Sequence, residues 1–129
     1  MNRNLVLTII MAILTGMFFV SGLDKLFNLN KVAAGLQSRL PIQVPFVLFV
    51  IAILGAAVLE IAAPSVMVYS AYTGRERQLA RGGATALALF TVLATLIYHW
   101  PPSGKNYYPA ISNLTAVGGL LLANLVFSD

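Results

Sequence analysis

The chain has 129 residues, of which 59% are hydrophobic and 9% are charged, and its net charge is +4. A water-soluble domain of this size has too much surface for its volume to bury so much apolar area, and such domains average about 25% charged residues. The composition therefore excludes an ordinary soluble domain, and the lack of cysteine excludes disulfides, thiolate nucleophiles and cysteine-ligated zinc or iron–sulfur sites.

The first apolar run extends from Leu5 to Leu23, close to the roughly 20 residues that cross a bilayer as a helix. Arg3 before this run and the small residues of Val20-Ser21-Gly22 also fit a cleaved signal peptide. The run is long for the apolar region of a signal peptide. We therefore interpret it as the first membrane span.

Residues 24–44 connect the first two spans and contain most of the charge in this half of the chain. Val32, Leu36 and Leu40 recur every fourth residue, which predicts a short amphipathic helix on the membrane surface. Pro41 and Pro45 are placed to end that helix and to start the next element.

Three more apolar runs follow, at residues 46–69, 82–98 and 110–127. Together with the run at 5–23 they predict one all-α domain over residues 1–129, an integral membrane four-helix bundle. We therefore expect the lipid bilayer to surround this domain. The net positive charge does not indicate a nucleic-acid partner, because the basic residues lie at the ends of the spans. Aromatic residues gather at one membrane face: Tyr98, Trp100, Tyr107 and Tyr108.

The orientation follows from the basic residues between the spans. Each side of the membrane receives four of them, so the count alone does not decide. The dense cluster of Arg75, Arg77 and Arg81 favours the cytoplasmic side for this turn and for both termini.

Small and polar residues recur at three- and four-residue steps along one face of each span. Such faces allow close helix packing in lipid. The predicted stripes are Thr8, Ala12, Thr15, Phe19 and Gly22; Ala52, Ala56, Glu60, Ala63 and Pro64; Ala84, Ala88, Thr91, Thr95 and His99; and Asn113, Ala116, Gly119 and Ala123. The first stripe leads to Lys25, and Glu60, His99 and Asn113 lie on the other three, so we expect all four to point into the bundle.

Glu60 is the strongest candidate for a functional residue. It lies near the middle of its span, where a charged group costs at least about 2.5 kcal/mol, and intramembrane acids usually have a function. Pro64 removes the helical hydrogen bond to the Glu60 carbonyl, which weakens the helix at that point. The alternative is a structural glutamate that ties helices together.

The other candidates are His99 as a second catalytic residue, and Lys25 and Asn113 as ligand-binding residues. Each also has a structural interpretation: His99 as a boundary residue among aromatic side chains, and Lys25 as a lysine that extends to the headgroups. A metal site is not expected, because there is one histidine and the four acidic residues are dispersed.

The chain resembles the DoxX family of small four-helix membrane proteins. The residues that carry the resemblance are Gly16 to Lys25 at the end of the first span, Leu40-Pro41, Leu59-Glu60, His99, Asn113-Leu114 and Gly118-Gly119-Leu120-Leu121. Pro64 departs from the pattern, because the family tends to have a glycine-rich run after the glutamate. The resemblance implies a four-helix bundle, and some members look like the small membrane subunit of thiosulfate:quinone oxidoreductase or accessory components of oxidative-stress complexes.

These observations predict a membrane subunit or accessory factor of a redox assembly. It would bind a quinone, with no covalent cofactor, and a redox partner protein or a second copy of itself. Two alternatives stay open: a small proton-coupled transporter that uses Glu60, and a non-catalytic scaffold or assembly factor.

Overall fold

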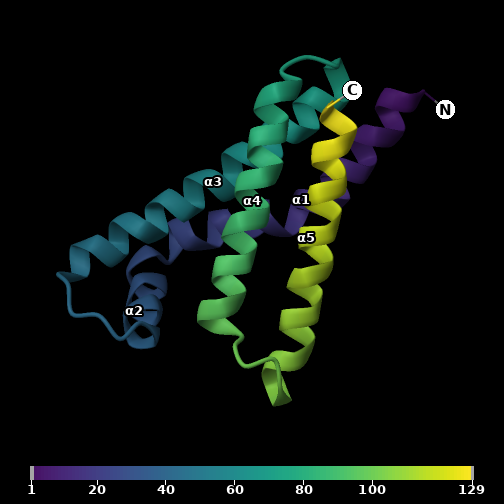
Figure 1. The fold of residues 1–129 in the computed structure, drawn as a ribbon. Coiled ribbons are helices and arrows are strands. Elements are labelled where there is room, and N and C mark those ends of the chain that lie inside the picture. Colours follow the sequence, from purple (N-terminus) through teal and green to yellow (C-terminus); the bar gives the residue numbers. More distant parts are fainter. Residues whose placement is uncertain (1, 129) are drawn as a thin grey trace.

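The computed structural model describes residues 2–128, and within them all regular structure is helical (Figure 1). The elements are α1 (Arg3–Phe27), α2 (Leu29–Arg39), α3 (Phe46–Thr73), α4 (Arg77–Tyr98), a short 3₁₀ helix η1 (Gly104–Asn106) and α5 (Tyr107–Ser128). The predicted all-α fold with a short helix between the first two spans is confirmed.

Four of the helices, α1, α3, α4 and α5, are long and apolar enough to cross a membrane. The protein is therefore a multi-pass membrane protein. These helices extend beyond the predicted runs, since α1 continues through Lys25 to Phe27 and α4 begins at Arg77. Long basic side chains at a helix end can reach the headgroups, so helices continue past the residues that hydropathy marks. Pro64 does not interrupt α3, which runs through it as one helix.

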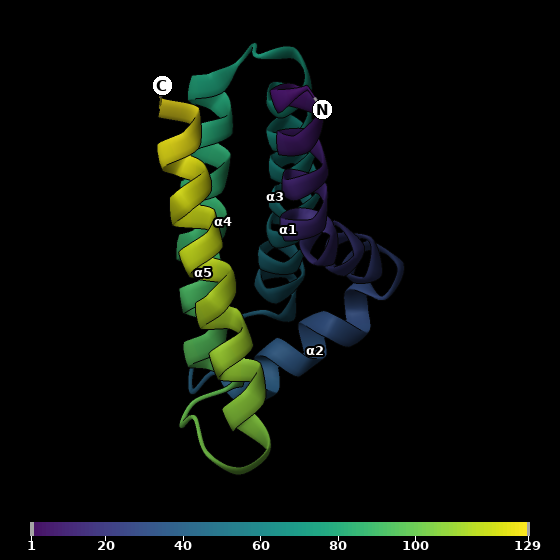
Figure 2. The same cartoon turned by 90° about the vertical axis from the view of Figure 1, so that its right-hand side faces the viewer.

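The four long helices form two pairs, α1 with α3 and α4 with α5, and α3 also packs against α4. The pairs lie together at the end that carries both termini and diverge towards the other end (Figures 1 and 2). Helix α2 lies at the diverging end (Figure 2). The arrangement is a bundle that is closed at one end and splayed at the other.

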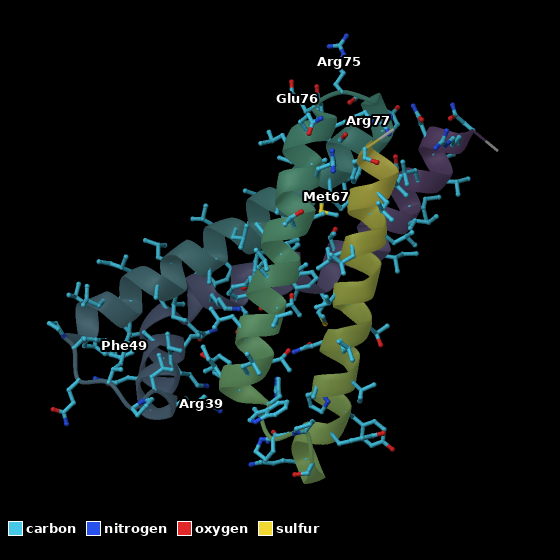
Figure 3. All side chains as sticks on the ribbon, in the orientation of Figure 1. Arg39, Phe49, Met67, Arg75, Glu76 and Arg77 are labelled. Atoms are coloured by element: carbon cyan, nitrogen blue, oxygen red, sulfur yellow. The ribbon has the colours of Figure 1, made fainter. Side chains whose placement is uncertain are left out.

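The main core lies at the closed end, where Met67, Leu87 and Leu120 are fully buried. Met67 lies between the helix pairs (Figure 3). The small-residue stripe of α4 is confirmed in Ala84, Ala88 and Thr91. Helix α5 contributes Ala123 from its stripe.

The predicted stripe on α1 is confirmed at Thr15 and Gly22, which are buried, and is wrong at Ala12 and Phe19. Its buried residues are Met11, Thr15, Phe18 and Gly22, whereas Ala12 and Phe19 are exposed. The first half of the α3 stripe is displaced in the same way, because Phe49, Ile53 and Ala57 are buried in place of Ala52 and Ala56. Large side chains fill the space between helices at these positions, with Met11 and Phe18 in the main core and Phe49 and Ile53 in a contact with α2, so small residues do not mark the inner face there.

A second, smaller core joins α2 to the splayed end. Ala33 and Leu36 of α2 pack with Phe49 and Ile53 of α3, and Val32 and Leu40 border this cluster. Phe49 is seen beside α2 in Figure 3. The apolar face predicted for this helix therefore packs against α3 rather than only against lipid.

Candidate functional site

Lys25 of α1 and Glu60 of α3 form an ion pair inside the bundle, with Nζ 2.6 Å from Oε1. Their side chains are 16% and 3% exposed. Oε1 accepts no hydrogen bond from any described residue, so the Lys25 ammonium is its polar partner and the contact is ionic. The ammonium donates instead to Ser21 Oγ at 2.7 Å. Two of the four predicted site residues are thus in direct contact.

The local sequence explains how the two charges meet. Helical side chains lean towards the N-terminus of their helix, and Lys25 accordingly runs back along α1 to Ser21. Gly22, between them, has no side chain to separate α1 from α3. A Cβ atom at Gly22 would lie 3.0 Å from the Ala57 carbonyl oxygen and 3.1 Å from Glu60 Cβ. The close approach of the helices therefore brings the lysine to the glutamate.

The ion pair forms part of the wall of a cavity of about 510 Å³, which we call the wedge pocket. It lies where the two helix pairs diverge, and α1, α2, α3, α4 and α5 all contribute to its lining. Its apolar wall includes Met17, Phe18 and Phe90. The Lys25 ammonium also lies 5.9 Å from the centre of the Phe90 ring. The volume is within the range of small-molecule sites, about 300–1,000 Å³.

Asn113, the third predicted site residue, lines the same pocket from α5. Its Nδ2 donates to Thr95 Oγ1 of α4 at 3.0 Å, which links the two helices of this pair. That bond fixes the orientation of the amide. The second N–H of the amide has no acceptor among the described residues and is available to a ligand.

His99, the fourth predicted site residue, does not join the others. It is the capping residue that follows the end of α4 at Tyr98, it is half-buried, and it is not part of the pocket lining. Tyr98, one position earlier, lines the pocket in its place. The backbone of His99 has already left the helical conformation (φ −128°, ψ 23°), so the helical spacing that predicted its inward position does not extend to it. The catalytic role of His99 stays a prediction.

Several pocket residues were not candidates from the sequence: Ser21, Lys31, Arg39 and Tyr98. In the sequence, Ser21 stood out only as part of the small-residue triplet Val20-Ser21-Gly22. Lys31 and Arg39 stood out only as charged residues of the segment that connects the first two spans. Arg39 lies over the Tyr98 ring, with the guanidinium carbon 4.6 Å from the ring centre. Figure 3 shows Arg39 between α2 and the end of α4. For Lys31 and Arg39 the available signal was the amphipathic pattern of α2, since these two polar residues line the pocket.

Polar side chains also join α4 to α5 near the termini. Asn124 Nδ2 donates to Thr85 Oγ1 at 2.6 Å and to the Arg81 carbonyl at 3.2 Å, and Asn124 Oδ1 accepts from the Arg81 guanidinium. Arg77 donates to the carbonyls of Val126 and Phe127, at the end of α5. These contacts hold the closed end of the bundle. They belong to the fold and not to the pocket.

Residues 2–128 contain no group of three or more histidine, cysteine, aspartate or glutamate side chains that could hold a metal ion. The polar groups of the wedge pocket are instead an ion pair, an amide, hydroxyls and further cations. This set suits an organic ligand with hydrogen-bond acceptors.

The fold and the pocket define an all-α, multi-pass membrane protein with a polar cavity between its helix pairs. Comparisons with protein-family models, curated proteins and solved structures find no match to this chain.

Proposed function

We propose that this chain is a membrane subunit or accessory factor of a redox assembly, and that it binds a quinone in the wedge pocket. The observation that carries the proposal is the Lys25–Glu60 ion pair in the wall of that pocket. A buried ion pair is often no more stabilising than apolar residues of the same volume. The stability of the fold therefore does not require an ion pair at this position, whereas the binding of a polar ligand does use charged groups in the pocket wall.

A quinone offers two carbonyl acceptors on an apolar ring, and the pocket has matching groups. Lys25 Nζ and the free N–H of Asn113 are the donors for the carbonyls. Phe18 and Phe90 supply aromatic surface for the ring. Ligand pockets in proteins combine such apolar walls with a few placed polar groups.

The ion pair also supports a role in proton exchange. Conversion of a quinone to a quinol consumes two electrons and two protons. The electrons come from the redox group of a partner protein, and the Glu60 carboxyl and the Lys25 ammonium hold and pass the protons beside the ring. The resemblance to the DoxX family supports this assignment, since some members look like the membrane subunit of a quinone-linked oxidoreductase.

The proposal includes the orientation of the chain. Both ends of the chain lie at the same end of the bundle as the turn with Arg75 and Arg77 (Figures 1 and 3). We place this end in the cytoplasm, because cytoplasmic loops carry an excess of arginine and lysine. The mouth of the wedge pocket then lies towards the opposite face.

The test is binding of a short-chain quinone to the purified protein in lipid nanodiscs, measured by calorimetry. The variant Lys25→Met/Glu60→Gln removes both charges without leaving one unpaired. We expect it to lower the affinity about tenfold or more, since a hydrogen bond from a charged donor contributes about 1.5–3 kcal/mol. The matched control is Lys105→Met/Glu76→Gln, which removes one charge of each sign outside the pocket. Equal affinity of both variants and the unmodified protein would rule out the quinone site.

The position of Glu60 in the pocket wall also favours a second candidate, a small proton-coupled transporter. A cationic substrate could replace the Lys25 ammonium at Glu60, and the carboxyl would then carry substrate and proton in turn. Substrate-driven proton movement in vesicles would support this alternative. If neither quinone binding nor transport is found, the remaining candidate is a scaffold whose ion pair specifies helix packing.

A further inference from the structure

The mouth of the wedge pocket carries two cations that no acid of the described chain neutralises. Lys31 and Arg39 both line the pocket from α2 and both are exposed. Within residues 2–128, the ion pair of Lys25 with Glu60 is the only one formed. Lys31 and Arg39 therefore present free positive charge to the cavity.

The remaining acid at the mouth is already engaged. The Asp24 carboxylate accepts from Asn28 Nδ2 at 3.0 Å, and the same amide donates to the Asp24 carbonyl at 3.2 Å. With Glu60 paired to Lys25, the mouth has the two charges of Lys31 and Arg39 against the single charge of Asp24. Its local charge is positive, so it favours an anionic group.

Arg39 is held in a position to bind such a group. Its guanidinium lies over the Tyr98 ring and donates from Nη1 to the Gly35 carbonyl at 3.1 Å. The side chain thus bends back along α2 towards Lys31. One of its five N–H donors is used in this contact, which leaves the others for an acceptor such as a phosphate oxygen.

The level of these cations in the membrane identifies the source of the anion. Helix α2 lies at the splayed end (Figure 2), where Arg39 lies over Tyr98 at the end of α4. The residues that follow Tyr98 include the aromatic residues Trp100, Tyr107 and Tyr108. All three are exposed, as expected at the level of the lipid headgroups. The apolar wall of the pocket, with Met17 and Phe18, continues from this mouth into the bundle.

We propose that Lys31 and Arg39 bind the anionic headgroup of a phospholipid at the mouth of the wedge pocket, with an acyl chain against the apolar wall. The headgroup contacts do not involve the ion pair, so they can be tested without a quinone. The acyl chain would occupy part of the apolar wall on which the quinone ring is proposed to lie, so the two ligands would compete for it. A bound lipid would close the mouth of the pocket towards the surrounding water. The ligand class is a lipid with net negative charge, as opposed to a zwitterionic lipid.

The test is native mass spectrometry of the full chain in detergent, with phosphatidylglycerol or phosphatidylcholine of identical acyl chains. We expect tighter binding of phosphatidylglycerol. In the variant Lys31→Gln/Arg39→Gln its affinity should fall about thirtyfold, which corresponds to about 1 kcal/mol for each cation near an anionic lipid. The control Arg75→Gln/Lys105→Gln removes two exposed cations outside the pocket and should keep the affinity.

A further variant separates charge from loss of structure. Lys31→Arg/Arg39→Lys keeps both charges and should keep the preference for phosphatidylglycerol within about threefold. Equal binding of the two lipids, or an equal loss in the control variant, would overturn the proposal. Inorganic phosphate at millimolar concentration should not displace the lipid. If it does, the site binds free phosphate and the lipid assignment is wrong.

Discussion

Gly22 of α1 lies against the backbone of α3, so that a Cβ atom there would be 3.0 Å from the carbonyl oxygen of Ala57. The same Cβ would lie 2.8 Å from the Ile61 side chain. Backbone atoms cannot move aside as a flexible side chain can, so the two helices would have to separate. The distance between α1 and α3 also sets the distance between Lys25 and Glu60. Helix packing and the candidate site therefore depend on one glycine.

We expect Gly22→Ala to destabilise the bundle by about 1–3 kcal/mol, the usual cost of added volume in a packed interior. The measurement is unfolding in mixed detergent micelles. Gly16→Ala on the same helix is the control, because a Cβ there meets no atom within 4 Å. Alanine is the better helix former, so this control should be neutral or stabilising. Equal stability of the two variants would contradict the close approach at Gly22.

The ion pair predicts that substitutions at Lys25 and Glu60 have non-additive effects on the free energy of unfolding, which a double-mutant cycle measures. Lys25→Met leaves the Glu60 carboxylate without its partner, and breaking a buried pair in this way costs on the order of 3 kcal/mol. Lys25→Met/Glu60→Gln removes both charges and should recover most of that loss. The unfolding free energies of the single and double variants measure the coupling. Additive losses would show that the two residues do not interact in the folded protein.

The elements of the fold were predictable because apolar runs and the spacing of apolar residues are local properties of the sequence. The four spans and the short helix between the first two were identified. The predicted runs were shorter than the helices, because most began too late or ended too early in the sequence. The inner face of α1 was predicted at Thr15 and Gly22 but not at Met11 and Phe18, since small residues mark an interface only where helix backbones touch. On α1 that contact occurs at Gly22, whereas Met11 and Phe18 fill the wider spaces along the same face.

The candidate site was predicted in part. The sequence placed Lys25, Glu60 and Asn113 on inner faces, and the structure brings all three to one pocket. It did not predict the contact between Lys25 and Glu60, because the lysine reaches the glutamate by running back along its own helix. The cations of α2 were also missed, since the path of a connecting segment depends on tertiary packing. The helical spacing that predicted an inward His99 ends at Tyr98, and His99 does not line the pocket.

Asn124 connects α4 to α5 near the termini, and its loss should weaken the closed end. Asn124→Leu would leave the Thr85 hydroxyl and the Arg81 side chain without their shared partner. Hydrogen bonds between membrane helices contribute about 0.6 kcal/mol on average and at most about 1.7. We expect a loss in this range in the unfolding assay. Asn106→Leu, in the short 3₁₀ helix, is the control, because no side-chain hydrogen bond of Asn106 joins two of the described helices.

The topology makes a prediction that is independent of any ligand. Four spans place the α3–α4 turn and the α4–α5 connection on opposite sides of the membrane. Reporter fusions after Arg75 and after Lys105 should therefore give opposite signals, with the Arg75 fusion cytoplasmic because of the surrounding arginines. The variant Arg75→Gln/Arg77→Gln should reduce the preference for placing this turn in the cytoplasm, since basic residues near the spans set the orientation. Signals from the same side would exclude the four-span arrangement, whereas opposite signals in the reverse sense would place the termini and Arg75 outside the cytoplasm.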